Sequence, residues 1–197
     1  MAITAKDVAA LRERTGAGMM DCKKALEETN GDIDKAVELL RSKGAAKAEK
    51  RAGRQVKEGV IANYIHHNGK VAVLVELNCE TDFVARTDDF QQLGKWIAEH
   101  IAAAAPIAVD KDQVPPEKVE SERRIFHEQV KAEGKPEHMI DKIVEGKLQA
   151  FYKDVALLHQ AWVREPKKTI GDLVKETSAK TGENVQVRRF VRYQLGE

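Results

Sequence analysis

Apolar residues recur at helical spacing in three short stretches between residues 4 and 43, and glycines separate the stretches. Thr4 and Asp32 stand where helix N-caps are expected, and Gly44 is expected to follow the third helix. The pattern therefore predicts a three-helix domain over residues 1–44. A domain of ~40 residues is close to the lower limit for independent stability, so we expect it to bind a partner and not to catalyse a reaction.

A basic segment follows the three helices. Between Arg41 and Lys57 the only acidic residue is Glu49, whereas lysines and arginines recur throughout. We interpret residues 45–58 as a basic linker between two domains. The alternative is a phosphate-binding strip over residues 41–57, which would make the chain an RNA-binding or ribosome-associated adaptor. The segment has no aromatic residue to stack on bases, which weakens this alternative.

Two runs rich in β-branched and other apolar residues come next, over residues 60–66 and 71–77. Asn68-Gly69 lies between them, and this dipeptide between two such runs is the strongest short signal for a β-hairpin. The hairpin would present residues 78–85 at one of its ends.

The rest of the chain is mostly helical by the same criterion, and it closes with an alternating stretch that predicts a strand. The predicted helices cover residues 87–105, 117–133, 137–151 and 169–180, and the strand covers residues 185–195. Strands and helices in separate blocks indicate an α+β fold. We therefore expect residues 59–197 to form a core domain, with an antiparallel β-sheet packed by helices and a helical hairpin.

Composition places the chain among soluble globular proteins, with 42% hydrophobic and 33% charged residues in a length of 197. Lys and Arg total 33 against 32 Asp and Glu, a formal net charge of +1. A protein that neutralises many phosphates carries a marked basic excess, so we expect no direct contact with nucleic acid. Neither a signal peptide nor an apolar run of membrane-spanning length is present, so we expect a cytoplasmic protein without membrane contact.

The sequence contains no recognisable constellation for covalent or metal chemistry. Cys22 and Cys79 lack the spacing of a zinc site or a disulfide framework and are expected to be buried or half-buried thiols. The histidines lack metalloprotease spacing, and no nucleotide-binding glycine loop occurs. We therefore expect a protein that is not an enzyme and has no catalytic residue, bound metal or cofactor.

What remains are candidate contact residues. Phe83 follows Asp82 just beyond the hairpin, where an aromatic ring either packs into its own core or stays exposed for a partner. Met19 and Met20 follow a glycine turn directly, and they either fill the core of the small domain or form an adaptable interface. A general adaptor that binds peptides through its helical domain is a further possibility, but it leaves the loop unexplained.

Two long motifs in this order give the chain a specific resemblance to a known family. Residues 11–26 read LRERTGAGMMDCKKAL and residues 76–85 read ELNCETDFVA. With these motifs the chain resembles bacterial elongation factor Ts from about residue 3 to the end. The resemblance implies that residues 1–44 form a domain like the ubiquitin-associated domain, followed by the basic linker and the α+β core.

The resemblance also implies a function. Members of this family are guanine nucleotide exchange factors that bind elongation factor Tu with GDP, release the GDP, and stay bound until GTP enters. By analogy, the residues that displace the Mg²⁺ ion in the partner are Thr81, Asp82, Phe83 and Val84. By the same analogy, the residues of the three-helix domain that contact the partner are Arg12, Met19, Met20 and Lys23.

The chain looks like the short form of the family, with a single copy of the core where longer members have two related subdomains. A homodimer, forming a 2:2 complex with elongation factor Tu, would restore the second half. The strand over residues 185–195 is a plausible edge for that pairing. No cysteine lies beyond Cys79, so a disulfide across such an interface is excluded.

Overall fold

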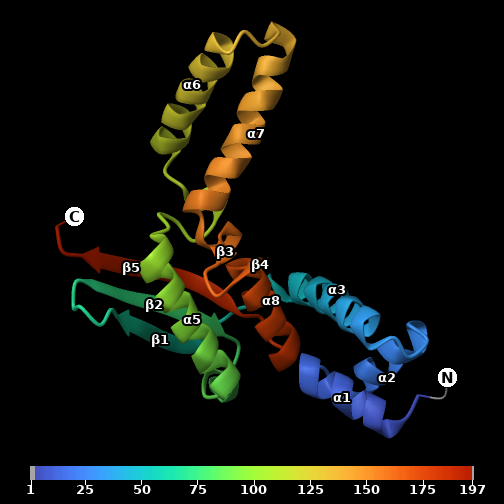
Figure 1. Ribbon diagram of the computed structural model, residues 1–197. Helices are drawn as coiled ribbons and strands as arrows, with labels where there is room; N and C mark the ends of the chain where they lie inside the picture. Colours follow the sequence, from blue (N-terminus) through green and yellow to red (C-terminus); the bar gives the residue numbers. More distant parts are fainter. Residues whose placement is uncertain (1–2, 197) are drawn as a thin grey trace. The chain divides into compact units, whose positions relative to one another are not determined.

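A computed structural model describes residues 3–196 of the chain (Figure 1). The ends of the predicted domains at residues 1, 2 and 197 lie outside the described part. The chain divides into two compact units. Unit 1 contains the residues up to 61 together with 76–94 and 172–187, and unit 2 contains 62–75, 95–171 and the residues from 188 onward.

Unit 1 begins with the three predicted helices, α1 (Ala5–Thr15), α2 (Met19–Glu28) and α3 (Ile33–Arg51). Thr4 caps α1 and Asp32 caps α3, each through a side-chain oxygen that accepts a backbone N–H of the first turn, as predicted. The helices share a small buried core formed by Val8, Leu11, Cys22, Ala25, Leu26 and Ala36.

The third helix is longer than the sequence predicted. It does not end at Gly44 but runs without interruption to Arg51. Gly44 faces α8 (Ile170–Thr181), where a Cβ atom on the glycine would lie 3.0 Å from the Cβ of Ala179. A glycine inside a helix costs about 1 kcal/mol relative to alanine. Here the missing side chain lets two helices approach closely, so packing overrides the local preference.

The principal β-sheet contains β1 (Glu58–Ile65), β2 (Val71–Cys79) and β5 (Gln186–Gln194), in the order β1-β2-β5. The predicted hairpin is confirmed, because β1 and β2 are joined by a tight turn in which Gly69 adopts a left-handed φ of 68°. Alternate residues of β2 are buried, among them Val73, Val75, Leu77 and Cys79.

Strand β5 lies at an edge of this sheet, as the sequence suggested. The backbone N–H of Leu195 donates to the carbonyl oxygen of Lys70 at 2.9 Å, so the end of β5 lies beside the start of β2 and the two strands run antiparallel. Within unit 2 the sheet residues include several exposed apolar side chains, namely Ile65, Leu74, Val191 and Tyr193, and Leu195 just after β5 is also exposed.

The remaining helices are α4 (Asp82–Ala85), α5 (Asp88–Ala104), α6 (Pro116–Ala132) and α7 (Glu137–Val155), with single turns at Lys111–Gln113 and Leu157–His159. The predicted helical hairpin is confirmed as α6 and α7, which bury Val130, Ile140, Val144 and Leu148. The α+β fold is therefore as predicted. None of the helices in residues 3–196 has the length and apolar character to cross a membrane.

A second, two-stranded sheet was not predicted. It pairs β3 (Ala161–Trp162) with β4 (Glu165–Thr169) in antiparallel fashion. A two-residue strand is too short to produce an alternating pattern, and Pro166 in β4 argues locally against a strand.

Unit 2 also buries a histidine completely. The Nε2 atom of His100 lies 3.0 Å from Oε1 of Gln160, and its Nδ1 atom accepts the backbone N–H of Val163 at 3.4 Å. Because Nδ1 is an acceptor, the neutral ring carries its proton on Nε2. Burial lowers the pKa of His100 below the usual value for histidine.

Candidate functional site

The loop over residues 81–84 leaves the end of β2 and forms the short helix α4. Thr81 is its N-cap, and its Oγ1 atom accepts the backbone N–H of Val84 at 3.4 Å. The side chain of Phe83 is 78% exposed, so the ring does not pack into the core of its own unit. Of the two possibilities that the sequence left open for this ring, the exposed one is confirmed.

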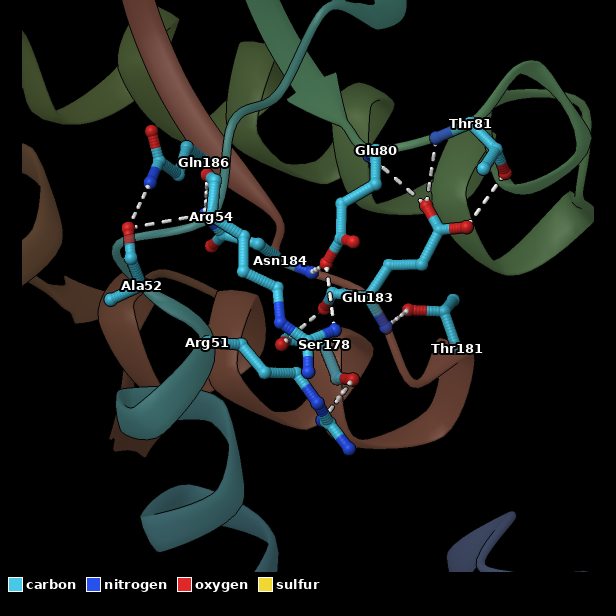
Figure 2. Close-up of polar contacts among 10 residues, drawn as sticks. All are labelled: Arg51, Ala52, Arg54, Glu80, Thr81, Ser178, Thr181, Glu183, Asn184 and Gln186. Atoms are coloured by element: carbon cyan, nitrogen blue, oxygen red, sulfur yellow. Dashed lines mark hydrogen bonds and ion pairs between the residues drawn. The ribbon is translucent and has the colours of Figure 1, made fainter.

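A single carboxylate from a distant segment holds the start of this loop (Figure 2). Glu183 Oε2 accepts the backbone N–H groups of Glu80 and Thr81, each at 3.0 Å. Glu183 Oε1 accepts the hydroxyl hydrogen of Thr81 at 2.6 Å. Hydrogen bonds to a charged acceptor are roughly twice as strong as neutral ones. The backbone that carries Phe83 is therefore anchored at its first residue.

Two further contacts hold the loop from other sides. The thiol of Cys79 donates to the carbonyl oxygen of Thr81 at 3.1 Å, and the side-chain amide of Gln91 donates to the carbonyl oxygen of Ala85 at 2.8 Å. Burial, and secondarily the negative charge of Glu183, raises the pKa of Cys79 to about 11. The sulfur is thus a neutral hydrogen-bond donor at neutral pH, as expected of a structural thiol.

The charge next to Phe83 is compensated within the same short helix. The carboxylate of Asp82 lies 2.8 Å from the guanidinium of Arg86, four residues later. Both side chains are at least partly exposed, so the ion pair contributes little to folding stability. It pairs Asp82 with a residue one turn later in the chain.

The end of α3 is tied to the same region (Figure 2). The Nδ2 atom of Asn184 donates to the carbonyl oxygens of Ala52 at 3.2 Å and Arg54 at 2.8 Å. Its backbone N–H donates to Glu80 Oε1 at 2.6 Å, and the same oxygen accepts from the Arg54 guanidinium at 3.4 Å. Residues just after α3, just after β2 and just before β5 therefore form one hydrogen-bonded network.

The second set of predicted contact residues lies on α1 and α2. Met19 and Met20 are 47% and 64% exposed, so the core position that the sequence left open for them is excluded, and Arg12 and Lys23 are also exposed. A shallow hollow is lined by Ala9, Arg12, Glu13, Gly16 and Met19. An apolar sulfur-containing surface flanked by two cations is thus available to a partner.

Lys180 connects this set with the region of the loop. A Cβ atom on Gly16, at the end of α1, would lie 2.3 Å from Cε of Lys180. The Nζ atom of Lys180 lies 3.0 Å from the carboxylate of Asp89, in the first turn of α5. The side chain of Lys180 thus spans from the end of α1 to the helix that directly follows α4. The structure places both sets of predicted residues in unit 1.

The basic strip of residues 41–57 is largely engaged within the protein. Five of its cations contact an acidic side chain or a carbonyl oxygen: Arg41 with Asp172 and Glu176, Lys43 with Glu28, Lys47 with Asp21, Arg51 with the carbonyl oxygen of Ser178, and Arg54 with Glu80. Phosphates would have to compete with these partners. The pairing argues against an RNA-binding role for this strip.

The contacts of Glu183, Asn184 and Arg54 were not expected from the sequence. Each joins residues between 26 and 132 positions apart, so no local periodicity reveals them. The available signal was the polar run Gly182-Glu183-Asn184 between a helix and a strand, which marks a turn but not its partners.

Within the described residues, no group of three or more His, Cys, Asp or Glu side chains is placed to hold a metal ion.

Comparison with known proteins agrees with these features. The family profile described as "Elongation factor TS" matches residues 2–197. The chain is 58% identical over 197 residues to "Elongation factor Ts" of Fervidobacterium nodosum, with 100% of both chains covered. It is 56% identical over 195 residues to the protein of the same name from Thermosipho melanesiensis, covering 99% of this chain and 100% of the relative. For that of Nitratidesulfovibrio vulgaris, the identity is 57% over 196 residues, covering 100% and 98%.

Proposed function

Because this chain belongs to the elongation factor Ts family, and is therefore a nucleotide exchange factor for elongation factor Tu and not an enzyme, we propose that its 81–84 loop displaces the Mg²⁺ ion of the partner. In this proposal Phe83 enters the GTPase domain of elongation factor Tu as an apolar wedge. Thr81 and Val84 shape the turn, and Asp82 helps to fix it.

The observation that carries the proposal is an exposed aromatic ring on an anchored backbone. Phe83 is 78% exposed, whereas Glu183 and Gln91 hold the backbone on either side of it. Burying a Phe side chain is worth about 1.5–3 kcal/mol, which this ring forgoes in the free protein. A partner that covers the ring recovers that free energy, and the anchored backbone limits the entropy lost on binding.

Displacing the ion explains the release of GDP. Mg²⁺ requires near-ideal octahedral geometry and bridges protein ligands to the phosphates of the nucleotide. A small shift of a loop or helix in the partner therefore removes a major attraction that holds GDP. Binding is reciprocal, so GDP weakens the binding of the factor by the same ratio as the factor weakens that of GDP. The factor stays bound to the open partner until GTP enters.

The exposed residues of α1 and α2 supply a second contact in this proposal. Met19 and Met20 offer apolar, polarizable side chains, and Arg12 and Lys23 offer positive charge beside them. Residues 1–44 act as the partner-binding domain, residues 45–58 as the connector and residues 59–197 as the core. The separate buried core of the three helices supports this division, although α3 extends into the connector.

A second copy of the chain would cover the exposed apolar side chains of the sheet. Leu74 of β2 and Val191 and Tyr193 of β5 are exposed apolar side chains on neighbouring strands, and a partner surface would remove them from water. The proposed assembly is therefore a homodimer in a 2:2 complex with elongation factor Tu, pairing through the β5 region. As a translation factor, the protein would act in the cytoplasm.

The direct test is the rate of release of fluorescent GDP from elongation factor Tu. The wild-type chain is expected to accelerate release, and the Phe83→Ala variant is expected to be defective while folding normally. No acceleration by the wild-type chain would contradict exchange activity. Full activity of Phe83→Ala would contradict the wedge.

A further inference from the structure

Two adjacent residues between α8 and β5 bind two different parts of unit 1. Glu183 binds the start of the 81–84 loop through three hydrogen bonds, to two backbone N–H groups and one hydroxyl. Asn184 is 3% exposed and binds the end of α3 through two hydrogen bonds from Nδ2. Consecutive side chains therefore join the proposed wedge to the last helix of the partner-binding domain.

Further hydrogen bonds connect the neighbours of these two residues with one another. Glu80 Oε1 accepts from the backbone N–H of Asn184 and from the Arg54 guanidinium, and Gln186 Nε2 donates to the carbonyl oxygen of Ala52 at 2.9 Å. The residues that follow α3 thus bind the segment of residues 184–186 at several points. Movement of the 81–84 loop relative to the end of α3 would break hydrogen bonds of buried or half-buried groups, which are costly to leave unpaired.

We propose that Glu183 and Asn184 are positioning residues for nucleotide exchange: Glu183 sets the direction of Phe83, and Asn184 fixes the distance from the wedge to the contact residues on α1 and α2. The inference rests on the proposed function, because it assumes that both sets of residues contact elongation factor Tu. Neither residue itself touches the partner in this account.

The two residues should have different kinetic effects. The wedge acts when Mg²⁺ leaves, so loosening it lowers the maximal rate of GDP release more than it weakens the initial complex. The distance between two contact surfaces sets the effective concentration of the second contact once the first has formed. Loosening the end of α3 therefore raises the concentration of factor that gives half-maximal rate.

The test measures GDP release from elongation factor Tu as a function of factor concentration. Glu183→Ala is expected to lower the maximal rate about tenfold with a change in half-saturating concentration of at most about twofold. Asn184→Ala is expected to raise the half-saturating concentration about fivefold, with a maximal rate within about twofold of wild type. Equal effects of both variants on both parameters would overturn the proposal.

Control variants separate positioning from loss of stability. Glu99→Ala removes another paired glutamate, which binds Arg164 in unit 2, and Asn78→Ala removes another amide that donates to a backbone carbonyl, that of Glu58 at 3.2 Å. Both are expected to leave the kinetic parameters within about twofold of wild type. Glu183→Gln keeps an oxygen for the two backbone N–H groups and is expected to restore most of the maximal rate. Failure of this rescue would contradict a positioning role.

A double-mutant cycle measures the coupling between Glu183 and the loop that it holds. If Glu183 acts through Thr81, the loss in the combination of Glu183→Ala with Thr81→Val is smaller than the product of the two single losses. Losses that multiply would overturn the inference. Phe83→Ala distinguishes the wedge role of Phe83 from the positioning role of Glu183. If Phe83→Ala is defective while Glu183→Ala is normal, only the positioning role fails. If Phe83→Ala is fully active, the proposed function fails.

Discussion

The hydroxyl group of Thr81 lies 2.6 Å from the carboxylate of Glu183, a residue 102 positions further along the chain. This contact joins the first residue of the loop that carries Phe83 to the segment that precedes the last strand. An exposed aromatic ring on a free loop would sample many directions and lose that entropy on binding. In this protein the contact with Glu183 already holds the loop before a partner binds, so less entropy is lost on binding.

The exposed methionines of α2 give the first prediction. Met20→Ala should raise the half-saturating concentration in the exchange assay about threefold to tenfold, because truncating an apolar contact residue typically costs about 1 kcal/mol or somewhat more. The maximal rate should not change, since Met20 is distant in sequence from the loop. Met139→Ala is the matched control, because Met139 is 42% exposed but lies on α7. Equal effects of the two variants would count against the contact role of α2.

The exposed sheet residues predict the assembly state. The complex with elongation factor Tu should have the mass of two copies of each protein, measured by light scattering. Tyr193→Glu should shift it toward 1:1 by raising the dissociation constant of the dimer at least about tenfold, which corresponds to about 1.4 kcal/mol. Ile125→Glu places the same charge on an exposed apolar residue of α6 and should leave the mass unchanged. A 1:1 mass for the wild-type complex would contradict the dimer.

The buried His100 predicts a pH dependence of stability. Its pKa is lowered in the folded protein, so below pH ~6.5 the unfolded chain binds a proton that the folded chain resists. Stability is therefore fully present above that pH and declines as the pH falls toward the lowered pKa. The melting temperature of the wild type should decrease between pH 7 and pH 5, and His100→Gln should reduce that decrease.

The matched control for this prediction is His127→Gln. The side chain of His127 is 44% exposed on α6, so this variant removes a histidine that is not buried. If the melting temperature of His100→Gln decreases with pH as steeply as that of the wild type, another group is responsible for the decrease.

Gly59 predicts a site where a methyl group is not tolerated. It has a φ of 152°, and a Cβ atom there would lie 2.1 Å from the carbonyl oxygen of Leu77 in the neighbouring strand. Gly59→Ala should lower the free energy of unfolding by at least ~1–3 kcal/mol, the usual cost of such backbone strain. Gly53→Ala has open space around the new atom and should have little effect. Denaturant titration compares the two variants, and equal midpoints would contradict the prediction.

Much of the fold follows from local sequence patterns. The caps at Thr4 and Asp32, the Asn68-Gly69 turn and the apolar stripes locate the helices and the hairpin within a few residues, because each depends on neighbours along the chain. The end of α3 was not predictable in this way. Glycine at position 44 favours a helix end locally. Within α3, however, its lack of a side chain leaves room for close packing against Ala179 of α8.

The candidate site was likewise predictable only where it depends on local sequence. The exposed position of Phe83 was one of two possibilities from its place after a strand, and only the structure distinguishes them. The anchor at Glu183 and the tie from Asn184 to the end of α3 depend on tertiary contacts more than 100 residues apart, which leave no periodic signal in a single sequence.

Displacement of Mg²⁺ by the Phe83 loop is tested most directly by the effect of the ion itself on the variant. GDP release from elongation factor Tu is measured with saturating wild-type or Phe83→Ala factor, first in excess Mg²⁺ and then in excess EDTA. If the loop acts by removing the ion, wild type should exceed Phe83→Ala about tenfold or more in Mg²⁺, and the ratio should fall to within about twofold in EDTA. The same ratio under both conditions would contradict the account.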